Sequence, residues 1–197
     1  MDFMKVYMSF LLFVIFLVGC GSNNTYRQST IVSKPYNAPE IDSNVKQKYL
    51  NAINAVRSQE RSCGSAGKFR SAPALKWSNA LYKAAYEHST DIAKSNNFSH
   101  KGSNGSSDWT SHVQHLGRCS SFKERIENNG YKQWKNIAEN IAMGSSTVDQ
   151  VMTQWLDSDG HCANIMNPNF TDVGMADVTQ EGSDIWHCWT QNFAAHQ

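Results

Sequence analysis

The spacing of apolar residues constrains the fold of this chain more than any other feature of its sequence. Over much of the chain, apolar residues recur at three- and four-residue steps, which is the spacing of one face of a helix. This spacing predicts a helix that begins at Ser43, a second one capped by Ser78 or Asn79, and a third one after Thr147. Thr147 and Gln150 fit a capping box.

The pattern changes near the C-terminus, where residues 173–178 and 185–193 read as strands. The second of these strands carries large apolar groups on both faces, so we expect both of its faces to be buried. Residues 108–135 are less regular and indicate a short helix that ends at residues 128–130. Helices followed by strands in one small domain predict an α+β fold in which helices cover a sheet.

A polar turn is expected between the third helix and the strands. Gly160 lets the backbone turn, and His161, Cys162 and Asn164 follow within four positions. Pro168 then blocks further regular helix. We expect this turn to present His161 to a cleft that the rest of the fold builds.

The N-terminal leader predicts a lipid-anchored protein of the bacterial cell envelope. Lys5 precedes an apolar run over residues 10–18, which has the length of a signal peptide and is too short to cross a bilayer comfortably. The Leu-Val-Gly-Cys sequence that ends at Cys20 resembles the lipobox of bacterial lipoproteins, in which this cysteine is lipidated. An ordinary secretory signal and an uncleaved anchor are the alternatives. We expect a membrane anchor through lipid on Cys20, with the domain facing the periplasm or the exterior.

Composition divides the chain into three parts. Residues 1–19 are the expected signal peptide, residues 20–42 are rich in Ser, Asn and Thr and predict a flexible tether, and residues 43–197 form the folded domain. The formal net charge is +1, and 18% of the residues are charged. Because nucleic-acid binding needs a concentrated basic face, we expect no nucleic-acid partner.

The cysteines of the domain predict two disulfides. Apart from Cys20, the chain has Cys63, Cys119, Cys162 and Cys188. An even number of cysteines in an exported domain is typical of disulfide pairs. The residues alone leave three connectivities open.

Candidate site residues lie far apart in the sequence. His100 follows the second helix, beside a loop of Gly, Ser and Asn, where a side chain can reach a cleft. Glu139 lies in an apolar run, so if buried it needs a cation, a metal or several hydrogen-bond donors. A structural role, in which Glu139 only binds backbone amides, is an equal alternative. Together with His161, these residues make a normal open zinc set of two imidazoles and one carboxylate.

Three other histidines are better explained by structure than by a site. His88 lies on the apolar stripe of the second helix, so we expect a core histidine with a nearby hydrogen-bond acceptor. His112 and His115 have the spacing of a metal pair on a helix, but a solvated loop explains them better.

Five ordered motifs carry a family resemblance. They are Leu75-Lys-Trp77, His88-Ser-Thr-Asp91 with Asn97-Phe-Ser-His100, Ala138-Glu139-Asn140-Ile141, Trp155-x-x-Ser-x-Gly-His161-x-x-Asn164-Ile165 with Phe170-Thr-x-Val-Gly174, and Trp189-Thr-Gln-Asn-Phe193. With these motifs, residues 43–195 resemble the bacterial branch of the CAP superfamily, which groups cysteine-rich secretory proteins, antigen five and pathogenesis-related proteins. The resemblance implies a three-layer α-β-α sandwich with a central cleft.

The resemblance also implies a site. In the family, two histidines and two acidic residues line the cleft and can hold a divalent metal, and His100, Glu139 and His161 match three of them. The second acid falls near Ser158, where this chain departs from the pattern, and the flanking Asp157 or Asp159 is a candidate substitute. Asn140 and Asn164 are further candidates for the cleft.

A disulfide pairing follows from the same resemblance. Related bacterial chains often have cysteines that match Cys63 and Cys162, which implies that these two pair and that Cys119 pairs with Cys188. A Cys162–Cys188 bridge with Cys63–Cys119 is the alternative, because the turn and the last strand can lie close together.

For function, the resemblance implies a CAP domain outside the cytoplasm that binds a small or lipid-like ligand, with zinc as a candidate metal. The sequence has no His-Glu-x-x-His, no Gly-x-Ser-x-Gly and no phosphate-binding loop, so we expect binding rather than turnover. One alternative is a metal-dependent hydrolase of envelope components or peptides with Glu139 as base. Another is a surface adhesion or interaction module.

Overall fold

The computed structural model describes residues 33–179 and 187–197. The expected signal peptide, Cys20 and the first part of the expected tether lie outside the described residues. Within the described residues, no helix combines the length and the apolar character that crossing a membrane requires.

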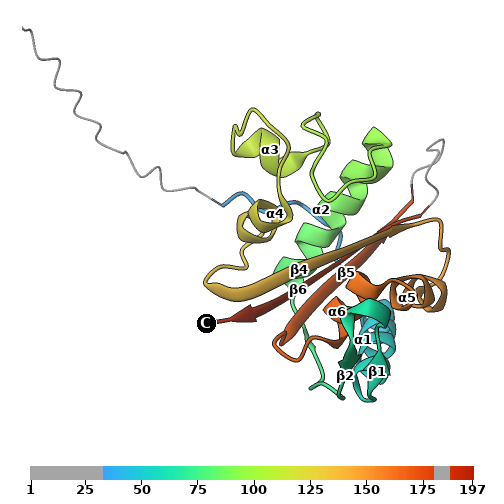
Figure 1. Ribbon diagram of the computed structural model, residues 1–197. Helices are drawn as coiled ribbons and strands as arrows, with labels where there is room; N and C mark the ends of the chain where they lie inside the picture. Colours follow the sequence, from blue (N-terminus) through green and yellow to red (C-terminus); the bar gives the residue numbers. More distant parts are fainter. Residues whose placement is uncertain (1–32, 180–186) are drawn as a thin grey trace, which may run out of the picture. The chain divides into compact units, whose positions relative to one another are not determined.

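A four-stranded sheet forms the middle layer, in the order β3-β5-β6-β4 (Figure 1). Its strands are β3 (Lys76–Trp77), β4 (Trp134–Met143), β5 (Asp172–Val178) and β6 (Cys188–His196). The β3–β5 pair is parallel, and β6 is antiparallel to both β5 and β4. Every residue of β6 except its last is buried, which confirms the expectation that both of its faces are covered. The strand β4 was not predicted from the sequence.

One face of the sheet is covered by α2 (Asn79–Ser95), with α4 (Phe122–Asn128) and the short α3 (Trp109–Val113) beside it (Figure 1). The helix α2 begins where expected, since the hydroxyl of Ser78 accepts a hydrogen bond from the N–H of Leu81. It packs closely on β5, because a Cβ at Gly174 would overlap Leu81 and Tyr82. Glycine is therefore required at this contact.

The opposite face is covered by α1 (Ser43–Arg57), α5 (Val148–Leu156) and α6 (Asp159–Met166) (Figure 1). A small hairpin of β1 (Arg61–Ser62) and β2 (Lys68–Phe69), joined by the 3-10 turn η1 (Gly64–Ala66), lies beside α6. Thr147 caps α5 through the N–H of Gln150, as predicted. The three-layer α-β-α arrangement is confirmed.

The expected polar turn around Gly160 is wrong, because residues 159–166 form the helix α6. The N–H of Cys162 donates to the C=O of Ser158 at 2.8 Å, which is the first helical hydrogen bond of α6. Gly160 has no positive φ and is simply part of the helix. Pro168 does follow its end, as expected.

The last ten residues of the expected tether lie against the domain. The side-chain amide of Asn128 binds both backbone groups of Lys34, at 3.0 Å from its N–H and 2.8 Å from its C=O. The N–H of Tyr36 donates to Asn129 at 2.8 Å, and the hydroxyl of Tyr82 donates to the C=O of Pro39. Residues 33–42 are called the arm below, since they are held by α2 and by the end of α4.

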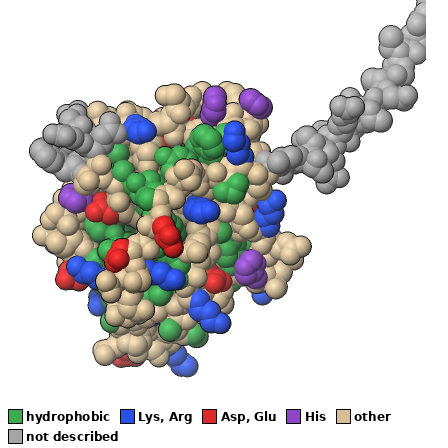
Figure 2. All heavy atoms as spheres, turned by 180° about the vertical axis from the view of Figure 1, so that it is seen from behind, with side chains coloured by type: hydrophobic (Ala, Val, Ile, Leu, Met, Phe, Trp, Pro, Cys, Tyr) green, Lys and Arg blue, Asp and Glu red, His purple; other side chains and the backbone are tan. Residues whose placement is uncertain are grey.

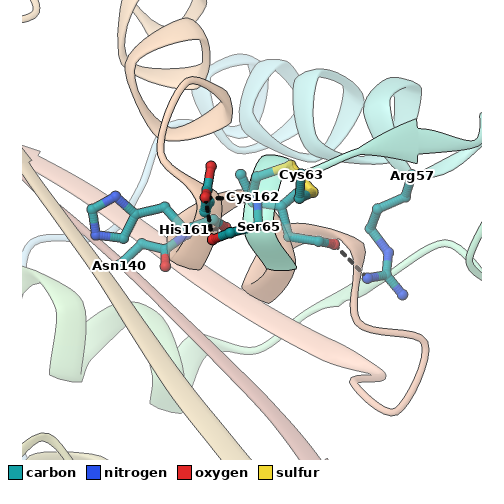
Figure 3. The surroundings of a disulfide bond; sticks show 8 residues. Arg57, Cys63, Ser65, Asn140, His161 and Cys162 are labelled. Atoms are coloured by element: carbon teal, nitrogen blue, oxygen red, sulfur yellow. Dashed lines mark hydrogen bonds between the residues drawn. A yellow bond between two sulfur atoms is a disulfide. The ribbon is translucent and has the colours of Figure 1, made fainter. Parts of the chain in front are cut away.

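One disulfide joins Cys63 to Cys162 and ties the β1–β2 hairpin to α6 (Figure 3). This confirms the pairing that the resemblance implied. The predicted Cys119–Cys188 bridge is wrong, and the Cys63–Cys162 pairing also rules out the alternative connectivity. Cys119 is half-buried in the loop before α4, whereas Cys188 is buried at the start of β6, where burial raises the pKa of its thiol to about 12.

Candidate functional site

Glu139 lies on β4, directly opposite Asn192 of β6 in the register of the sheet. Its side chain is only 1% exposed. An unpaired carboxylate in such a place would be strongly destabilising. The neighbouring residues must therefore compensate for its charge.

Arg125 on α4 provides this compensation. Its Nη2 lies 3.1 Å from Oε1 and 3.0 Å from Oε2 of Glu139, and its side chain is also only 1% exposed. Arg125 was not predicted as a site residue, because it lies in the irregular region 108–135. The one local signal was a cation next to Ile126 within a short helix.

His100 lies beside the same carboxylate, in the loop after α2. Its Nδ1 is 3.0 Å from Oε1 of Glu139, and its C=O accepts a hydrogen bond from Nη2 of Arg125 at 2.9 Å. Because an ionised carboxylate only accepts hydrogen bonds, Nδ1 carries a proton, and Nε2 is an acceptor whenever the ring is neutral. The side chain is 51% exposed, so this acceptor is open to a ligand.

The charges in the site follow from these contacts. Burial alone would raise the pKa of Glu139, but the charge of Arg125 and the hydrogen bonds from His100 and Arg125 lower it to about 2. Glu139 is therefore ionised at neutral pH. Its negative charge is balanced by Arg125, so the ion pair adds no net charge to the site.

His88 is a buried core histidine, as predicted. Its Nε2 donates to the C=O of Ser99 at 2.9 Å and lies 3.8 Å from Oε1 of Glu139. Burial and then the charge of Arg125 lower the pKa of His88 from 6.5 to about 3. The ring is therefore neutral, and it holds the start of the loop that carries His100.

His161 lies on α6, close enough to His100 for the two side chains to interact electrostatically. Its backbone C=O accepts a hydrogen bond from Asn140 at 3.2 Å, and Asn140 is held in turn by Gln191 and Asn164. Figure 3 shows the imidazole extending away from the disulfide, with Asn140 beside it. Burial and then the charge of His100 lower the pKa of His161. Asn140 and Asn164, predicted for the cleft, thus hold the helix that carries His161.

A sequence model of the cysteine-rich secretory protein family, CAP, matches residues 50–193. The chain belongs to the CAP family.

Solved structures show the same fold. An extracellular protein containing an SCP domain from Bacillus anthracis is 23% identical, with a TM-score of 0.56 over 81% of this chain and 45% of that one. An outer surface protein of Borrelia burgdorferi is 16% identical, with a TM-score of 0.55 over 81% of this chain and 98% of that one. At these identities the likeness shows a shared fold and nothing more.

Curated relatives match shorter segments. The uncharacterized protein YkwD of Bacillus subtilis is 45% identical over 60 residues, which is 30% of this chain and 21% of YkwD. The uncharacterized membrane protein YlbC of the same organism is 28% identical over 119 residues, which is 60% of this chain and 28% of YlbC. The matched part is thus less than a third of each relative.

The donor set of this CAP domain does not fit the predicted three-residue metal site. The structure brings His100 and Glu139 together, but both oxygens of Glu139 already accept hydrogen bonds from Arg125. Among residues 33–179 and 187–197, no group of three His, Cys, Asp or Glu side chains is placed to hold a metal ion. His100 and His161 are the donors that remain open.

The two candidates for the second acid flank Ser158, and Asp157 is exposed at the end of α5. Asp159 accepts hydrogen bonds from the N–H and hydroxyl of Ser65 in η1. Ser158 is the N-terminal cap residue of α6, without a capping hydrogen bond from its side chain. Asp159 therefore stabilises the contact between α6 and η1.

Two other histidines lie on the surface, in and after α3. His112 lies in α3 and His115 in the turn after it, and both are exposed. The solvated loop expected for His112 is thus a short helix. Figure 2 shows basic side chains interspersed with acidic and apolar ones on the face opposite to Figure 1, so the residues coloured there form no block of one charge.

Proposed function

We propose that this chain is a membrane-anchored CAP-domain protein of the bacterial envelope that binds a small ligand through His100 and His161. The observation that carries the proposal is the oriented imidazole of His100, which is half-exposed and bound from behind by a buried carboxylate. The leader sequence and the extracellular SCP-domain neighbour from Bacillus anthracis support the location outside the cytoplasm.

The chemistry of the site indicates which ligands suit it. Nε2 of His100 accepts a hydrogen bond when the ring is neutral, and the lowered pKa of His161 favours a neutral ring there too. The ion pair behind His100 is neutral overall. A ligand with hydroxyl or amide N–H donors fits these acceptors better than a purely apolar one.

This proposal is tested by calorimetry on the full chain in detergent micelles. The probes are N,N′-diacetylchitobiose for a sugar, D-Ala-D-Ala for a peptide and oleate for a lipid. We expect one of the two polar probes to bind, and we expect His100→Ala and His161→Ala each to weaken it at least about tenfold, the loss of about 1.4 kcal/mol. His112→Ala, at an exposed histidine on α3, is the matched control. Binding that survives both site variants would contradict the proposal.

A hydrolase is the second candidate, because the Glu139–His100 contact of 3.0 Å has the geometry of an oriented general base. The pKa of about 2 makes Glu139 itself a poor base, so His100 takes this role. Hydrolysis of a cell-wall fragment that is lost in His100→Ala would favour this candidate. Binding without any turnover would favour the first one.

A further inference from the structure

We infer that Arg125 takes the position beside Glu139 that a divalent cation would need, so that Glu139 positions His100 and does not ligate a metal. This inference goes beyond the proposed function, because it holds whether or not the site binds a ligand. It rests on the donors around the carboxylate and on the burial of Arg125.

The carboxylate of Glu139 has no acceptor position to spare. Nη2 of Arg125 contacts both of its oxygens, and Nδ1 of His100 contacts Oε1. Asn192, with its amide oriented to satisfy both ends, donates to Oε2 at 3.2 Å and accepts from the N–H of Ala85 at 3.2 Å. An ionised carboxylate has about four lone-pair sites, and these contacts occupy all of them on Glu139. A metal ion would have to displace one of these donors.

Arg125 is fixed in place on its other side. Its Nη1 donates to both the C=O and the hydroxyl of Ser120, each at 3.2 Å, and Nη2 donates to the C=O of His100. The helix that carries it is held by a complete capping box between Ser121 and Glu124. The guanidinium therefore has several partners to lose if it moves aside for a cation.

Electrostatics act in the same direction. A cation on the oxygens of Glu139 would lie beside the guanidinium of Arg125, which stays positively charged at any ordinary pH. The repulsion between the cation and the guanidinium would be strong, because the side chains of Arg125 and Glu139 are both buried. The same guanidinium holds the backbone of His100 directly and its ring through Glu139. Arg125 is thus a positioning residue for His100.

The test uses zinc as the probe and the full chain in detergent micelles. We compare Arg125→Met with Arg118→Met, since Arg118 is an exposed arginine that also pairs with a glutamate. We expect Arg125→Met to bind zinc at least about tenfold more tightly than the wild type, by equilibrium dialysis, because the buried carboxylate of Glu139 then has no cation partner and can bind the metal ion. We expect Arg118→Met to match the wild type.

The gain in zinc affinity must depend on Glu139. We expect Arg125→Met combined with Glu139→Gln to return to the affinity of the wild type. If the wild type already binds zinc as tightly as Arg125→Met, or if the double variant keeps the gain, the inference is overturned.

A second measurement covers the case in which Arg125→Met does not fold. In the wild type, the 13C signal of the Glu139 carboxylate, assigned by its loss in Glu139→Gln, should not move when zinc is added. A shift of this signal that saturates with zinc binding would show that Glu139 is a ligand despite Arg125, and it would overturn the inference.

Discussion

On the α1–α5–α6 side of the sheet the buried side chains are mostly apolar, with Arg57 of α1 as a charged exception, whereas the α2–α4 side buries several charged groups. Trp155, Ile53 and Ile165 are fully buried in the first region. The second region buries His88 and Arg125 as completely as the first buries its core. Burial stabilises the first region directly, whereas the second is stable only when each polar group finds its partner.

Two carboxylates within the polar region show how the partner decides the charge. Glu139 is paired with Arg125, and its pKa is lowered to about 2. Glu87 is bound by neutral donors, namely the N–H of Thr110 at 2.8 Å and the amide of Asn129 at 2.7 Å. Burial dominates there and raises the pKa of Glu87 to about 7. Burial alone thus does not determine the charge of a site residue.

The apolar region should show the largest single effect on stability. Trp155→Ala removes a fully buried ring, so we expect the free energy of unfolding to fall by about 3–5 kcal/mol. Val45→Ala, at an exposed position of α1, is the control and should change it by less than about 0.5 kcal/mol. Urea denaturation measures both. A similar loss in the two variants would show that the apolar side is not a packed core.

The disulfide adds a covalent constraint to the same region. Cys63 and Cys162 are separated by 99 positions, so their disulfide restricts the unfolded chain. Replacing both with Ala should lower the free energy of unfolding by about 2–5 kcal/mol, because the unfolded chain gains conformational entropy. Cys119→Ala should leave stability within about 1 kcal/mol, because that thiol is half-buried and forms no disulfide. Unfolding with and without dithiothreitol checks this. An unchanged midpoint for the reduced protein would contradict it.

The polar region should respond to pH in a way that the apolar region does not. The folded-state pKa of His88 is about 3 against 6.5 in the unfolded chain, so its contribution is lost as the pH falls below 6.5. The folded-state pKa of Glu87 is about 7 against 4.5, so its contribution increases as the pH falls through the same interval. The two effects oppose each other between about pH 6.5 and 4.5.

Glu87→Gln separates these effects. Between pH 6.5 and 5 we expect this variant to lose about 1.5–2 kcal/mol of stability more than the wild type, since one pKa unit corresponds to about 1.4 kcal/mol. Urea denaturation at the two pH values measures the difference. Glu124→Gln, at a partly exposed carboxylate whose pKa is lowered, should follow the wild type. Equal pH dependence in Glu87→Gln and wild type would contradict the assignment.

The arm should give the smallest effect. Asn128→Ala removes the side chain that binds both backbone groups of Lys34, so we expect a loss of about 1–2 kcal/mol and faster hydrogen exchange at the Lys34 amide. Asn169→Ala, at an exposed position, is the control. If exchange at Lys34 stays unchanged, the arm is held by its other contacts.

Much of the local structure could be predicted from short-range patterns. Helical spacing located α1, α2 and α5, and the C-terminal pattern located β5 and β6 within a few residues. The burial of His88 could also be predicted, because this residue lies on the apolar stripe of a long helix. The strand β4 was missed, and α6 was taken for a turn around Gly160, since glycine is a weak signal when tertiary contacts hold a helix.

What the sequence by itself determined is therefore the order of the elements, the family motifs and the candidate residues His100, Glu139 and His161. Only the tertiary structure decided what Glu139 does, because the decisive partner is Arg125, which comes from an irregular segment and carries no motif. Tertiary structure likewise decided that Cys119 and Cys188 do not pair, and that residues 33–42 bind the domain. Periodicity reports which face of an element is buried, whereas the charge and role of a buried group depend on residues that only the folded chain brings within 3 Å of it.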